Sequence, residues 1–311
     1  MRSTIKIKSL FFLVITMIAT SYCHAQELEI KMNGYGEKKL KKFPKKVYIK
    51  EFNVNFQMAA DAKAVSKTTT NSRKGSSSAS MSVAVTGVEV TDLQEITNSV
   101  YSDFIATLKN EGFEIVSAEA MSGAKFFEDH ELLESNVNEA QNPGYLKVTP
   151  EGFKYYVKGI SKKGKEKQAA VPMKLLKEFD DVLIINANYS FSSIYLTAKQ
   201  NTTLGTSSVK GKIGLKMPGC SIVAMGGIFT SLGFGPKKPQ EFEGVFENEG
   251  EKLKAFSAAT APSFSGFMTH TSNDFTHEAV ADGSKYKETT TGVINDFNNQ
   301  ALAQLVSYFG K

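Results

Sequence analysis

The stretch at residues 91–116 constrains the fold most, because it combines a complete helix signal with a strand signal. Thr91 and Gln94 have the spacing of a capping box, which marks a helix start. Gly112 stands where a glycine commonly ends a helix, and residues 113–116 then read as a strand. The apolar positions in between recur at helical spacing: Leu93, Ile96, Val100, Phe104, Ile105 and Leu108. A helix that passes through one glycine into a strand indicates an α/β layer.

Several other segments supply strands for the same layer. Residues 47–56 alternate between apolar and polar side chains, with a change of phase at Glu51 that predicts a bulge or a strand buried on both faces. The continuous apolar run at 182–185 is typical of a buried central strand. Further strands are predicted at 189–195, 209–217 and 221–229.

Helices are predicted at 119–136, from Pro150, from Pro172 to Phe179, and at 293–309. The composition, with 41% hydrophobic residues, 22 Phe and 11 Tyr, provides material for a sizeable core. We therefore predict an α/β protein with an α+β tendency. In it, helices flank a mixed β-sheet within a single main domain at residues 47–311.

Two segments look like loops on this scaffold. Residues 66–82 are almost entirely Ser, Thr, Lys, Asn and Gly, so a mobile Ser/Thr-rich loop is predicted at about 57–90. A glycine-rich turn is predicted at 226–236. Because loops on a rigid scaffold often carry binding, both segments are candidate partner contacts.

The first 25 residues have the pattern of a secretory signal peptide. Arg2, Lys6 and Lys8 precede an apolar run at 10–19, and a cleavage site follows after Ala25. Cys23 raises the alternative of a lipid anchor, although Tyr22 fits a lipobox poorly. The chain is therefore predicted to be exported, to the periplasm or to the outer membrane or cell surface.

Residues 26–46 are rich in lysine and are interpreted as a solvated N-terminal arm. Contact of this arm with anionic lipid headgroups is the functional alternative. Cleavage of the signal would leave 34 basic against 32 acidic residues, so the charge gives no support for nucleic-acid binding. Cys220 would then be the one remaining cysteine, and its apolar neighbours predict a buried, inert thiol.

Three motifs come close to known chemistry without completing it. Residues 159–166 follow a phosphate-binding loop until Glu166 replaces the Ser or Thr that would hold magnesium. Residues 130–134 begin like a zinc-peptidase helix, but Glu134 stands where the second histidine belongs, and an exposed helix face is the simpler interpretation. The remaining metal-capable cluster, a weak candidate metal site next to Glu278, consists of His270, Asp274 and His277. No cofactor is predicted, and no catalytic residue can be assigned.

The order of elements resembles the α/β domain shared by the curli-secretion lipoprotein family (CsgG-like) and the amino-terminal domain of TolB. The resemblance is carried by the strand at 47–52, the helix and strand at 101–116, the apolar strand after residues 179–181 and the closing amphipathic helix. It implies a role in assembly or interaction in the bacterial envelope, and it implies no catalytic residue. The poor lipobox and the Ser/Thr-rich segment at 66–82 depart from the curli-secretion proteins.

These observations favour an exported, non-catalytic protein that binds protein partners in the cell envelope. A membrane-inserting oligomer of a secretion-type pore is the first alternative, because residues 189–197 and 209–229 alternate like membrane hairpins. Such a hairpin would have to present its lysines to water. This is permitted, because the three lysines share one side of the strand at even-numbered positions: Lys210, Lys212 and Lys216. This alternative includes membrane association and a homo-oligomer. A hydrolase with an unrecognised site is the second alternative.

Overall fold

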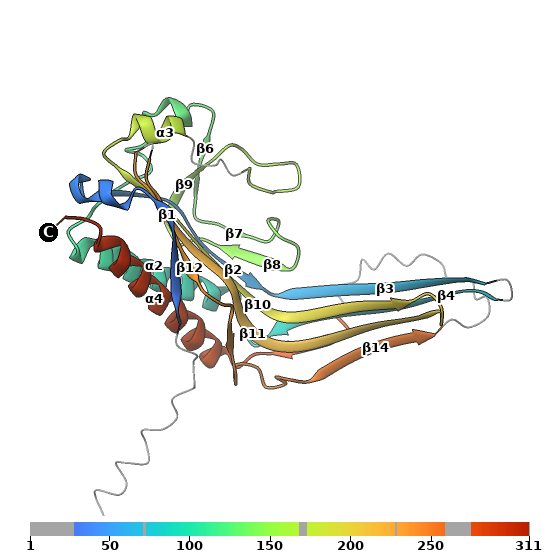
Figure 1. The fold of residues 1–311 in the computed structure, drawn as a ribbon. Coiled ribbons are helices and arrows are strands. Elements are labelled where there is room, and N and C mark those ends of the chain that lie inside the picture. The colour runs from blue at the N-terminus through green and yellow to red at the C-terminus, as the bar shows by residue number, and fades with distance from the viewer. Residues whose placement is uncertain (1–27, 71–72, 168–172, 228, 259–274, 311) are drawn as a thin grey trace, which may run out of the picture.

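The computed structural model describes residues 28–70, 73–167, 173–227, 229–258 and 275–310. An α/β body carries a long β arm that projects from one side of it (Figure 1). The predicted signal peptide therefore lies outside the described residues. The prediction of an α/β protein with a mixed sheet flanked by helices is confirmed.

The main sheet has ten strands, and its principal path runs in the order β1, β12, β11, β10, β2, β8, β7. The strands on this path are β1 (Ile30–Tyr35), β2 (Lys46–Gln57), β7 (Val137–Asn138), β8 (Tyr145–Val148), β10 (Leu183–Asn201), β11 (Thr206–Met225) and β12 (Ser231–Pro236). Three more strands pair beside it: β5 (Glu114–Val116), β13 (Gln240–Phe242) and β14 (Lys252–Ala258). β2 pairs in parallel with β10 and β5, and the other pairings of this sheet are antiparallel.

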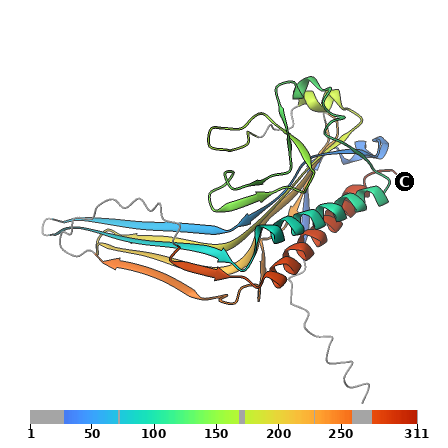
Figure 2. The ribbon, with the colours of Figure 1, turned by 180° about the vertical axis from the view of Figure 1, so that it is seen from behind.

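Two long helices, α2 (Val90–Asn110) and α4 (Gly283–Val306), cover one face of this sheet. Figure 2 shows them side by side on the body, and neither continues along the arm. The predicted apolar positions of α2 are largely buried, and Gly112 follows the helix with a φ of 82°, as predicted. The capping box differs from the prediction: it joins Glu89 to Asp92. α4 starts ten residues before its predicted start, because Asp282 accepts a hydrogen bond from the Lys285 amide and caps it.

The opposite face of the body is covered by short elements around a second hydrophobic cluster. These elements are η2 (Lys125–Phe127), β6 (Glu131–Glu134), β9 (Lys154–Val157) and α3 (Met173–Glu178). The predicted helices at 119–136 and from Pro150 are therefore wrong. Phe127 and Tyr156 instead stack with ring centroids 4.1 Å apart, so non-local packing decides the local conformation here.

The predicted bulge in the first long strand is confirmed. Along the parallel pairing of β2 with β10, Ile49 lies opposite Ile185, but Glu51 lies opposite Asn186. Lys50 is the extra residue, and its side chain is buried, with its ammonium 2.5 Å from the Glu51 carboxylate. Before the bulge the odd-numbered side chains of β2 face the helices, and after it the even-numbered ones do. Ile49 and Phe52 are therefore both buried, although they are three residues apart.

The predicted Ser/Thr-rich loop at about 57–90 is wrong, because most of it forms a hairpin. β3 (Ala59–Thr70) and β4 (Arg73–Thr86) pair antiparallel along the length of the arm. β15 (His277–Val280) adds to β4 in parallel. The sequence signal was weak because small residues, Ala64, Ser66, Ser77 and Ala79, occupy inward-facing positions where large apolar side chains would reveal a strand.

The Lys-rich segment at 26–46 also differs from its prediction as a solvated arm. β1 pairs with β12 at the edge of the main sheet, and a 3-10 helix, η1 (Glu37–Lys42), follows it. Leu40 is fully buried in this helix, while the lysines around it remain at the surface. Two buried leucines, Leu28 and Leu40, thus anchor a segment whose composition is otherwise that of a solvated chain.

The arm begins where β10 is irregular. The pairing of β10 with β11 shifts register around Ser192, and two backbone amides there leave the ladder. Both are satisfied by Gln57, the last residue of β2: its buried side-chain oxygen accepts from Ser193 N at 2.8 Å and from Ile194 N at 2.9 Å. One amide oxygen therefore replaces the backbone acceptors that the irregularity removes.

The substitution Gln57→Leu should lower the free energy of unfolding by about 2–4 kcal/mol, since two buried amides would lose their acceptor. Urea unfolding followed by circular dichroism measures this change. Gln200→Leu makes the same replacement at an exposed position of β10 and should stay within about 0.5 kcal/mol of the unsubstituted protein. Equal effects of the two substitutions would show that Gln57 has no special role.

Candidate interaction surface

The arm consists of two β layers that pack face to face. β3 and β4 form one layer, and the distal parts of β10 and β11 together with β14 form the other (Figure 1). Toward the tip of the arm the residues that meet between the layers are small, among them Ala64, Ala79, Ser77 and Ser207, all buried. The Ser77 and Ser207 hydroxyl oxygens lie 2.8 Å apart, and Ser207 also donates to the Ser77 carbonyl at 3.1 Å. The hydroxyls therefore pair with each other in the interior.

The outer side of the layer with β14 presents a regular grid of side chains, which we name the lysine face. Its three strands are in register, so directly opposed residues project on the same side. From the base of the arm outward, the three rows are Tyr195, Lys212 and Lys252; Thr197, Lys210 and Lys254; and Lys199, Ser208 and Phe256. All five lysines are exposed.

The electrostatics of the lysine face are one-sided. Lys210 lies directly opposite Lys254, and Lys212 lies directly opposite Lys252. Like charges in directly opposed positions destabilise a sheet. Within the part of the chain that the structure describes, none of the five lysines forms an ion pair, and the grid contains no carboxylate. This face therefore offers concentrated positive charge to a partner.

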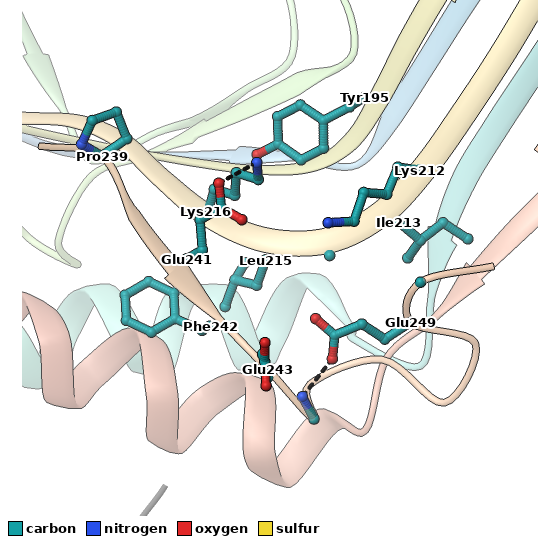
Figure 3. A pocket seen from close by; sticks show the side chains of 13 residues that line it. Tyr195, Lys212, Ile213, Leu215, Lys216, Pro239, Glu241, Phe242, Glu243 and Glu249 are labelled. Carbon is teal, nitrogen blue, oxygen red and sulfur yellow. Dashed lines mark hydrogen bonds and ion pairs between the residues drawn. The ribbon is translucent and has the colours of Figure 1, made fainter. Parts of the chain in front are cut away.

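A cavity of about 820 Å³ lies at the base of the lysine face (Figure 3). Lys212 and Lys216 of β11 line it together with Glu241 and Glu249. The Lys216 ammonium lies 2.5 Å from the Glu241 carboxylate and 4.5 Å from the centre of the Tyr195 ring. Burial raises the pKa of the Tyr195 hydroxyl, which donates to the Ser192 carbonyl at 3.1 Å. The positive charge of the arm thus meets carboxylates where the arm joins the body.

Of the three candidate metal residues, the structure describes one, His277. His270 and Asp274 lie outside the described residues. His277 begins β15, and its Nδ1 atom lies 2.9 Å from the Thr276 hydroxyl. Among the residues that the structure describes, no group of three His, Cys, Asp or Glu side chains has a metal-binding arrangement.

Glu166 and His130, from the two motifs that resembled catalytic sequences, both pack against neighbouring side chains. The Glu166 carboxylate is buried, lies 2.5 Å from the Lys147 ammonium and accepts a hydrogen bond from the Tyr155 hydroxyl at 3.1 Å. His130 precedes a strand and does not lie on an exposed helix face; its ring centre is 4.6 Å from that of Phe126. Burial lowers the pKa of His130.

The two predicted contact segments have different positions. The described residues of 66–82 belong to the arm, whereas much of the glycine-rich segment 226–236 is β12, paired between β1 and β11 in the body. Lys210 and Lys212 are two residues apart in the sequence, and so are Lys252 and Lys254. Each pair therefore projects on one side of its strand, and the two pairs together form the centre of the lysine face. The alternation in both segments was a usable signal, but their pairing was not visible in the sequence.

Comparison with known proteins adds no assignment. No protein-family model, curated protein or solved structure matches the chain. The resemblance to the curli-secretion and TolB-type domains therefore stays a prediction. No helix among the described residues is long and apolar enough to cross a membrane.

The close approach of the two layers should depend on Gly211. A Cβ atom at this position would lie 2.9 Å from Leu196 Cδ2 and 3.2 Å from both Leu253 Cβ and Met81 Sδ. Gly211→Val should therefore lower the free energy of unfolding by about 1–3 kcal/mol through overpacking. Urea unfolding of the variant measures this loss.

Gly219 is the matched control, because it lies on the same strand with nothing within 4 Å of an added Cβ. Gly219→Val should change the free energy of unfolding by no more than about 0.5 kcal/mol. A similar loss in both variants would mean that strand propensity, and not the spacing of the layers, sets the requirement for glycine.

Proposed function

We propose that this protein is an exported component of the cell envelope that binds a partner and acts in assembly without catalysing a reaction. The observation that carries the proposal is the arm, which extends away from the body and is the natural contact surface. The resemblance to envelope assembly proteins agrees with this role. The interpretation of residues 1–25 as a signal peptide supports the location.

The construction of the arm suits a contact that must be held in a fixed direction. β10 and β11 have 19 and 20 residues and pass without interruption from the body into the arm. Their inner ends are buried in the body, where Leu183, Ile184 and Ile185 are fully covered. A partner on the arm would therefore meet a surface whose position the hydrophobic core of the body fixes.

A membrane-inserting oligomer is the second candidate, supported by the length and alternation of the hairpins. A transmembrane β-strand needs about 9–11 residues. β3, β4, β10 and β11 each have 12 or more. Their lysines lie on outer faces, so separated hairpins would present small and apolar inner faces to lipid and lysines to water.

Site-directed crosslinking in the native cell tests the proposed role of the arm. Ser78→Cys places a thiol on the exposed outer side of β4, and Ser307→Cys places one at the exposed end of α4. We expect a photoactivatable maleimide to crosslink a partner from position 78 and not from position 307. Crosslinks from both positions or from neither, in protein recovered from the envelope, would contradict a partner site on the arm.

The labelling is selective because Cys220 is unreactive. It is buried, and burial raises the pKa of its thiol to about 12, so the reactive thiolate is scarce at pH 8. Once the predicted signal peptide, which contains Cys23, has been removed, the unsubstituted protein should take up no maleimide until it is unfolded. Recovery of the protein in a large ring that only detergent extracts would instead favour the membrane-inserting oligomer.

A further inference from the structure

We infer that the lysine face binds an anionic lipid surface, with the distal end of the arm seated among the headgroups. The inference rests on the proposed function, in which the arm is the contact surface, and it names the partner of that surface. It concerns peripheral contact of an intact two-layer arm. It does not require the hairpins to separate or to cross the bilayer.

The arm segments carry the excess positive charge of the chain. The arm segments at 59–86, 191–217 and 252–258 contain ten Lys or Arg residues and a single acidic residue, Asp61. After removal of the predicted signal, the rest of the chain must therefore be net acidic. The lysine face keeps two directly opposed lysine pairs that an uncovered sheet would disfavour. An anionic surface that covers this face would convert their repulsion into attraction.

The distal end of the same layer exposes large apolar side chains. Leu204, in the turn between β10 and β11, is 71% exposed, and Phe256 of β14 is 61% exposed. Phe256 lies opposite Ser208, two residues from the end of the paired region at Thr206. Large apolar side chains beside lysines are typical of surfaces that sit at the boundary between headgroups and acyl chains.

This combination favours lipid over other polyanions. Lysine is a flexible point charge, suited to headgroups that move independently, whereas arginine dominates bidentate recognition of phosphate in nucleic acids. An aromatic ring such as Phe256 can stack on a base, but Leu204 has no such use. Outside the arm segments the acidic residues outnumber the basic ones after signal removal, so the net positive charge lies on the arm.

The opposite layer supplies a matched control surface. Lys63 and Lys67 are exposed on the outer side of β3, and the two layers of the arm lie between them and the lysine face. Packed sheets are separated by about 10 Å, which exceeds the screening length of about 8 Å at physiological salt. Substitution of two lysines on β3 removes the same charge as substitution of two lysines on the lysine face. A difference in binding between the two variants therefore reports which side of the arm is bound.

The experiment measures sedimentation with vesicles, using the protein as the cell produces it. One vesicle is phosphatidylcholine alone, and the other contains equal parts phosphatidylcholine and phosphatidylglycerol. We expect binding to the anionic vesicles only, weakening as salt is raised. Each lysine at an anionic surface contributes about fivefold to binding, so Lys210→Gln with Lys254→Gln should weaken it about 25-fold. Lys63→Gln with Lys67→Gln should weaken it less than twofold.

A third variant, Leu204→Ser with Phe256→Ser, keeps every charge and should also weaken binding to the anionic vesicles. Loss of binding by unfolding is excluded by the thermal midpoint. Removing the opposed charges at positions 210 and 254 should leave the midpoint unchanged or raise it. If the double variant at positions 210 and 254 loses binding and also has a lowered midpoint, Lys254→Gln alone is measured, because this single substitution relieves the same repulsion.

Equal binding to both vesicle types, or equal loss in the two lysine variants, would overturn the inference. So would retention on a soluble polyanion, heparin, without vesicle binding, which would assign the face to a glycan or nucleic acid. Absence of vesicle binding while position 78 still crosslinks a protein would sink the lipid inference and leave the proposed function standing. Vesicle binding through the lysine face without any crosslinked protein would support the lipid inference and remove a protein partner at position 78 from the proposed function.

Discussion

The antiparallel pairing of β10 with β11 is the interaction on which the rest of the structure depends. Toward the body, Ile184 and Ile185 place it in the middle of the sheet that α2 and α4 cover. Toward the arm, the same two strands form the layer that β14 completes. The register shifts around Ser192 divide the two parts, and Gln57 satisfies the amides released there. A single hairpin thereby links a hydrophobic body to a polar arm without a flexible connection.

The body could be predicted from the sequence because large apolar side chains mark it. The periodicity of α2, the apolar run in β10 and the change of phase at Glu51 each correspond to what the structure shows. The hairpin of β3 and β4 could not be predicted, because toward its tip the inward positions hold Ala, Ser and Gly, whose alternation with Lys and Ser carries little contrast in hydrophobicity. The stacking of Phe127 on Tyr156 and the pairing of β1 with β12 are likewise non-local, and no local pattern announces them.

The distribution of charge matters more than its sum. A chain that is nearly neutral after signal removal keeps its positive charge on the arm and places five glutamates at 241–251, beside the base of the arm. Lys216 pairs with Glu241 at that junction, whereas the lysines farther out have no such partner among the described residues. Beyond this junction the positive charge of the lysine face is therefore not neutralised by carboxylates, which favours an anionic partner on the arm over one at its base.

The packing of the arm also separates the two candidate functions. For the hairpins to enter a bilayer as separate pairs, the layers would have to part. The hydroxyls of Ser77 and Ser207, now paired in the interior, would then need new partners in lipid. The close contacts around Gly211 would be lost as well. Binding through the lysine face requires none of these changes, because its side chains already point outward. The observed packing thus suits a contact made by the intact arm.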